Sequence, residues 1–161
     1  MSTHNLSRNQ APCPRSIQVL EAFTFSAAVL LICTAFAKLL SATGNAKVLQ
    51  SQDPVFSIPF RTLFWVVGGI ELIVAFACLL KARLLLQLGL IGWLATNFVI
   101  YRLGLSLLGY RKPCPCLGSL TDELHLSMQT AESILIIVLA YLLIGSYIGL
   151  IWLLIKRRAF A

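Results

Sequence analysis

Residues 84–108 read LLLQLGLIGWLATNFVIYRLGLSLL, a run whose one charged residue is Arg102. A bilayer core is about 30 Å thick, and a helix needs roughly 20 consecutive apolar residues to cross it. The run is long enough to do so, and it lacks the alternation of polar and apolar residues that marks a barrel strand. We therefore expect a transmembrane helix over these residues.

Three further apolar runs accompany this one, at about residues 17–40, 62–80 and 133–155. The chain of 161 residues is 58% hydrophobic and 12% charged, whereas soluble domains carry about 25% charged residues. The sequence therefore predicts an all-α membrane protein, an antiparallel bundle of four transmembrane helices. The bundle occupies residues 17–161, and a mobile cytoplasmic tail, residues 1–16, precedes it.

Lysine and arginine residues between the runs indicate the topology, because cytoplasmic segments carry an excess of both. If the N-terminus is inside, the inner segments carry seven of them, namely Arg8, Arg15, Lys81, Arg83, Lys156, Arg157 and Arg158. The outer loops then carry four: Lys47, Arg61, Arg111 and Lys112. Both longer loops, about 41–61 and 109–132, are therefore expected outside. The net charge of +7 reports this topology and does not indicate binding to nucleic acid.

Three charged residues lie inside the predicted spans, all in the outer half: Lys38, Glu71 and Arg102. Glu71 follows the outer end of its span at about residue 62, which places it roughly 14 Å deep at 1.5 Å per residue. An unpaired carboxylate at that depth is costly. We expect Glu71 to pair with Lys38 or Arg102, or to be protonated, and both a structural ion pair and a functional site fit this pattern.

Small residues predict the faces along which the helices pack. Gly68, Glu71, Ala75 and Cys78 form one stripe of the second span, and Gly145-x-x-x-Gly149 lies in the fourth. Small side chains let membrane helices approach closely. A packed bundle around Glu71 follows from these stripes.

The loop after the third span reads RKPCPCLG over residues 111–118. A disulfide needs Cα atoms about 4.4–6.8 Å apart, a distance that Cys114 and Cys116 barely reach with Pro115 between them. A disulfide under strain is easily reduced, which is typical of catalytic rather than structural disulfides. Arg111 and Lys112 favour the thiolate, the form that attacks disulfides. The pair is therefore a candidate catalytic dithiol.

Two neighbouring features bear on this dithiol. Thr121 suits a helix cap, and Leu124, Met128 and Ala131 follow at i, i+4 and i+7, which predicts a short helix on the membrane surface. His125 is a candidate proton acceptor. Alternatively, the two thiolates with either Met128 or His125 would suit Cu(I). Redox chemistry is favoured over metal binding, because no second cysteine pair or methionine-rich tract accompanies the motif.

These features resemble the MauE family (methylamine utilisation) within the broader DoxX-like membrane proteins. Members are four-helix bundles with a lysine late in the first helix, a glutamate in the second and a C-x-C-F-G string after the third. The corresponding residues here are Lys38, Glu71 and the string from Cys114 to Gly118, within a resemblance that covers about residues 20–155. Proline 115 replaces the family's usual glycine, and Leu117 its usual phenylalanine.

The resemblance implies a protein of the bacterial cytoplasmic membrane that works beside thioredoxin-like proteins outside the cytoplasm during enzyme maturation. The first hypothesis is a thiol–disulfide redox protein whose Cys114 and Cys116 exchange disulfides with such a partner. By analogy with other four-helix redox proteins, electrons would pass to a quinone near Glu71, Lys38 and Arg102. One alternative is a non-catalytic assembly or anchor subunit whose dithiol is incidental or binds copper. The other is a small-solute carrier, which the absence of a broken span or inverted repeat disfavours.

Overall fold

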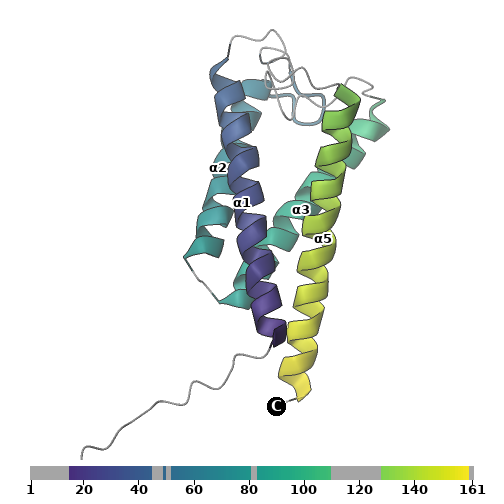
Figure 1. The fold of residues 1–161 in the computed structure, drawn as a ribbon. Helices are drawn as coiled ribbons and strands as arrows, with labels where there is room; N and C mark the ends of the chain where they lie inside the picture. Colours follow the sequence, from purple (N-terminus) through teal and green to yellow (C-terminus); the bar gives the residue numbers. More distant parts are fainter. Residues whose placement is uncertain (1–14, 45–48, 50–51, 81–82, 110–127, 160–161) are drawn as a thin grey trace, which may run out of the picture.

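The computed structural model describes residues 15–44, 49, 52–80, 83–109 and 128–159. Over these ranges the chain forms four helices, labelled as in Figure 1: α1 (Arg15–Thr43), α2 (Phe60–Leu79), α3 (Leu84–Leu107) and α5 (Met128–Ala159). The described residues contain no strand beyond an isolated antiparallel bridge between Gln52 and Pro59. The predicted all-α bundle of four transmembrane helices is confirmed.

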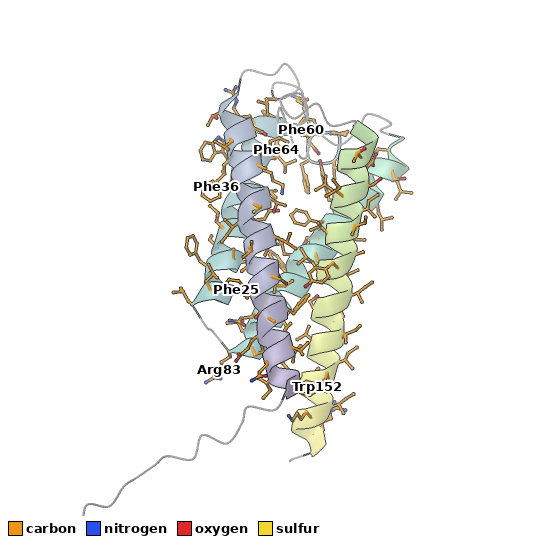
Figure 2. The ribbon with its side chains drawn as sticks, in the orientation of Figure 1. Phe25, Phe36, Phe60, Phe64, Arg83 and Trp152 are labelled. Atoms are coloured by element: carbon orange, nitrogen blue, oxygen red, sulfur yellow. The ribbon has the colours of Figure 1, made fainter. Side chains whose placement is uncertain are left out.

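Each helix is long and apolar enough to cross a membrane, over residues 17–43, 60–79, 84–107 and 132–156. Large apolar side chains cover the outside of the bundle, as in Ile73 of α2, which is 70% exposed. Phe25 and Phe36 point away from the bundle, whereas Phe60 and Phe64 are buried in it (Figure 2). An exterior of this kind is stable only in lipid, so the protein is a multi-pass membrane protein.

The interior is built from small residues that allow close helix contacts. Ala27, Ala28 and Ala75 are fully buried in the main core cluster. A Cβ added to Gly145 of α5 would overlap the ring of Phe23 on α1. At Gly149 an added Cβ would lie 2.9 Å from a Leu20 methyl carbon, so both glycines of the predicted motif lie at helix contacts.

The helices associate most extensively as two pairs, α1 with α2 and α3 with α5. The end of α1, the start of α2, the end of α3 and the start of α5 lie at one end of the bundle, the upper end in Figure 1. The C-terminal end of α5 lies at the opposite end. The segments that follow α1 and α3 therefore both begin at the upper end.

The fourth predicted span, at about residues 133–155, agrees with the apolar stretch at 132–156, and its helix α5 includes further residues back to Met128. Met128 and Ala131 of the predicted surface helix therefore belong to the first turns of α5. No glycine or proline separates Met128 from Ser133, so nothing in the sequence ends a helix there. The rest of that predicted helix, residues 121–127, and residues 1–14 of the predicted tail lie outside the described residues.

Candidate functional site

An ion pair between α1 and α2 is buried in the upper half of the bundle. The ammonium nitrogen of Lys38 lies 2.6 Å from Oε1 of Glu71, and the two side chains are 10% and 1% exposed. Gly68, one turn before Glu71, allows this approach, because a Cβ there would meet the Leu39 side chain at 3.1 Å. Of the alternatives that the sequence left open for Glu71, the structure selects pairing with Lys38.

Arg102 lies at the same level but has another partner. Its guanidinium donates to Oε1 of Glu132 at 2.8 Å, joining α3 to the first turns of α5. The Glu132 side chain is 48% exposed and that of Arg102 23%. Arg102 is therefore no counter-ion of Glu71, although both side chains line a common cavity.

The second carboxylate oxygen of Glu71 has no partner among the described residues. Oε2 is buried and accepts no hydrogen bond from them. The Thr34 hydroxyl on α1, which lines the same cavity, donates to the Leu31 carbonyl at 3.1 Å. An unsatisfied buried polar atom costs about 1–3 kcal/mol. An unsatisfied group of this kind in a cavity indicates a place for water or for a ligand.

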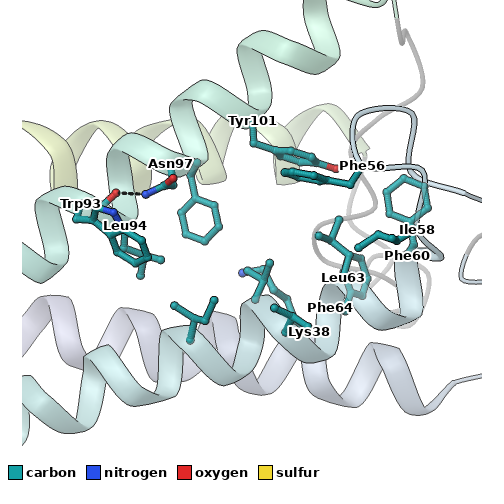
Figure 3. A pocket seen from close by; sticks show the side chains of 14 residues that line it. Lys38, Phe56, Ile58, Phe60, Leu63, Phe64, Trp93, Leu94, Asn97 and Tyr101 are labelled. Carbon is teal, nitrogen blue, oxygen red and sulfur yellow. Dashed lines mark hydrogen bonds between the residues drawn. The ribbon is translucent and has the colours of Figure 1, made fainter.

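Two cavities flank the ion pair. The larger, about 400 Å³, lies between α2, α3 and residues 56–60, with aromatic rings in much of its wall (Figure 3). The smaller, about 80 Å³, lies between α1, α3 and α5 and is lined by Glu71 and Arg102. Lys38, Phe98 and Tyr101 line both cavities. The Lys38 nitrogen is 5.3 Å from the centroid of the Phe98 ring, within the range of a cation–π contact.

A turn held by Asp53 closes the upper end of the larger cavity. Asp53 is 1% exposed, and its Oδ1 accepts hydrogen bonds from the backbone N–H groups of Val55 at 2.8 Å and Phe56 at 2.9 Å. The Tyr101 hydroxyl of α3 donates to Oδ2 of the same carboxylate. The Phe56 and Tyr101 rings stack with centroids 5.9 Å apart. Asp53 thus links the segment between α1 and α2 to α3.

A match to a protein family model over most of the chain identifies the family of this protein. A family model described as methylamine utilisation protein MauE matches residues 17–158. The chain belongs to the MauE family. No curated protein and no solved structure matches the chain. The MauE match includes all four spans and both members of the buried ion pair, and it makes this chain a membrane protein of a family linked to methylamine utilisation.

The MauE match also includes the predicted dithiol. Cys114, Pro115, Cys116, Gly118 and His125 lie outside the described residues. The helices on either side of them are described, because α3 ends at Leu107 and α5 begins at Met128, both at the upper end of the bundle. In this MauE protein the segment with the two cysteines therefore starts and finishes at the end nearer the ion pair.

Sequence reasoning missed the link between Asp53 and Tyr101. Asp followed by Pro54 is a turn signal, since an aspartate side chain accepts hydrogen bonds from backbone N–H groups just ahead of it. That signal would have found the turn. It would not have found Tyr101, which follows Asp53 by 48 positions in this MauE sequence.

Proposed function

We propose that this chain is a membrane thiol–disulfide redox protein in which Cys114 and Cys116 exchange disulfides with an extracytoplasmic, thioredoxin-like partner. A thiolate of the reduced partner attacks the Cys114–Cys116 disulfide and forms a mixed disulfide. The partner's second thiol then attacks the partner's sulfur in the mixed disulfide and releases the cysteine of this chain as a thiol. The partner leaves with a disulfide, and Cys114 and Cys116 each keep one hydrogen as thiols. The reverse sequence of steps reduces the partner's disulfide, and the two reduction potentials decide the direction.

The observation that carries this proposal is the position of the helix ends. Leu107 and Met128, which flank the cysteine segment, lie at the same end of the bundle as the ion pair and the larger cavity. We propose that the dithiol between these two helix ends lies at the membrane boundary, where it can meet a soluble partner. The Cys-Pro-Cys string itself, with Arg111 and Lys112 beside it, favours a reactive thiolate.

We place the protein in the bacterial cytoplasmic membrane, with both termini in the cytoplasm and the cysteine segment outside. The excess of lysine and arginine at the ends of the spans that the sequence assigns to the inside supports this orientation. Disulfides persist in oxidising compartments such as the periplasm. The family description names methylamine utilisation, and a role in maturing exported enzymes, which the resemblance implies, fits this location.

Thiol trapping in membranes tests the proposal. Replacing Cys13, Cys33 and Cys78 by alanine leaves Cys114 and Cys116 as the two thiols of the chain. We expect a maleimide with a large mass tag that cannot cross the bilayer to label both or neither, with one reversible two-electron transition across a series of glutathione potentials. The matched Cys114→Ser variant should lose this transition and take one tag under reducing conditions.

Two outcomes would instead favour the assembly or Cu(I)-binding alternatives. In the first, both thiols stay reduced and labelled at every potential, so that the pair is not redox-active. In the second, the thiols resist the reagent until a copper chelator is added. A thioredoxin-like protein with a single active-site cysteine provides a further check, because exchange requires it to form a mixed disulfide with the wild type and not with the Cys114→Ser/Cys116→Ser variant.

A further inference from the structure

The larger cavity opens to the lipid between α2 and α3. Val66 and Trp93 both line it, and they are 53% and 55% exposed on the outside of the bundle. Both residues lie inside membrane spans. A molecule that enters between them therefore comes from the membrane and must be soluble in lipid.

The wall of this cavity carries one charged group among the described residues, Lys38. Of the neutral polar groups, the Asn97 amide donates one N–H to the Trp93 carbonyl at 2.8 Å (Figure 3). The Tyr101 hydroxyl donates to Asp53. An ammonium has three donors and no acceptor, and the contact with Glu71 uses one. The cavity thus offers N–H donors to a hydrogen-bond acceptor within an apolar, aromatic surround.

A flat ring that carries carbonyl groups fits this description. Rings stack or pack edge-on against aromatic side chains, and a carbonyl oxygen accepts a hydrogen bond from the ammonium. The volume of about 400 Å³ lies within the range of about 300–1,000 Å³ that small-molecule sites occupy. A plain acyl chain would offer no acceptor to the remaining N–H donors of the ammonium, and a phosphate headgroup would meet a lysine that Glu71 already neutralises.

We infer that the cavity between α2 and α3 binds the ring of a membrane quinone, with the Lys38 ammonium donating a hydrogen bond to a ring carbonyl. The inference rests on the proposed function, to which it adds the electron acceptor. Oxidation of the Cys114–Cys116 dithiol to a disulfide releases two electrons and two protons, and reduction of the quinone to the quinol takes up both. The balance requires no further reactant.

The smaller cavity supplies a place for the protons of this reaction. It lies on the other side of Lys38, and its volume of about 80 Å³ exceeds the roughly 10–15 Å³ that one water needs. The unpartnered Oε2 of Glu71 and the guanidinium of Arg102 give such water polar neighbours. Water there, together with Glu71 and Lys38, provides a route for protons between the bundle rim and the ring.

Fluorescence of Trp93 tests the binding site directly. The Trp65→Phe/Trp152→Phe variant keeps Trp93 as its single tryptophan, and it would be placed in phospholipid nanodiscs. The probe is 2,3-dimethyl-1,4-naphthoquinone, whose substituted ring does not add thiols. We expect saturable quenching. Its competitor, 2,3-dimethylnaphthalene, has the same skeleton without carbonyls and should displace the quinone at least tenfold less effectively than a second quinone does.

Three further variants in the same background identify the site. Val67→Phe fills the cavity and should abolish saturable quenching, whereas Ile73→Phe adds the same ring to the lipid face and should leave it unchanged. Lys38→Met/Glu71→Leu removes the donor together with its counter-ion and should weaken binding at least tenfold. Quenching that never saturates, or that is equal in all variants, would overturn the inference, as would equal competition by the hydrocarbon.

The two proposals fail separately. If the quinone binds as expected but Cys114 and Cys116 do not exchange disulfides with a thioredoxin-like protein, the redox function fails and the site stands. If the quinone does not bind while Cys114 and Cys116 still exchange disulfides with a thioredoxin-like protein, the site fails and the redox function stands.

Discussion

Replacing Lys38 by methionine removes the partner that holds Glu71 in the membrane. Glu71 is 1% exposed, its Oε2 is already unpartnered, and its Oε1 would lose the 2.6 Å contact. Removing one member of a buried ion pair costs roughly 3–5 kcal/mol. The loss of stability has an upper limit, because an unpaired Glu71 can take up a proton instead of staying charged. Protonating a carboxyl group of ordinary pKa at pH 7 costs about 3.7 kcal/mol. We therefore expect Lys38→Met to lower the free energy of unfolding by about 3–4 kcal/mol.

The matched double variant separates lost charge pairing from lost packing. Lys38→Met/Glu71→Leu replaces both charges by apolar groups, a change that is often neutral or stabilising in buried pairs, so its stability should lie within about 1 kcal/mol of the wild type. Reversible unfolding in dodecylmaltoside micelles with increasing dodecyl sulfate, followed by far-ultraviolet circular dichroism, measures all variants. Lys156→Met, near the end of α5, is the control for loss of a lysine.

The reasoning would be refuted in either of two ways. Lys38→Met could cost no more than Lys156→Met, which would mean that Glu71 needs no counter-ion. Alternatively, the double variant could be as unstable as the single one. The methylene chain of Lys38, and not its charge, would then hold α1 against α2.

Four further variants, one of them a control, probe other contacts under the same unfolding conditions. Tyr101→Phe should lose about 1–3 kcal/mol and expose the chain around Asp53 to protease, because a buried carboxylate loses a donor; unchanged cleavage would contradict the role assigned to that link. Gly145→Leu should lose at least about 1–3 kcal/mol through overpacking against α1, while Gly89→Leu, which meets nothing within 4 Å, should be near neutral. Arg102→Gln should cost less than about 1 kcal/mol, since its ion pair is partly exposed; a larger loss would show that Arg102 supports Glu71.

The four transmembrane helices could be predicted from the sequence, because a long apolar run is a local signal. It left three alternatives for Glu71, namely pairing with Lys38, pairing with Arg102 and protonation, and could not choose among them. That choice depends on the rotation of each helix about its axis, which Gly68 and Leu39 decide through packing. Glu132 was assigned to a loop, so its pairing with Arg102 was not foreseen.

The link between Asp53 and Tyr101 escaped prediction for a related reason. Asp53 is a buried aspartate outside any helix and so has no periodic signature, and its partner Tyr101 lies far along the chain on α3. The cavity between α2 and α3 could not be predicted either, because it depends on how the side chains pack between the two helices. Redox activity of Cys114 and Cys116, disulfide exchange with a thioredoxin-like protein and the outward orientation of their segment stay predictions.

The pairing of Lys38 with Glu71 has a consequence for how the protein is made. Both residues belong to the first two spans, which emerge from the ribosome before α3 and α5 exist. The charge of Glu71 is therefore neutralised as soon as the first helical hairpin forms in the bilayer. We expect this hairpin to insert stably by itself. The ion pair of Arg102 with Glu132, in contrast, can form only after the start of α5 has been synthesised.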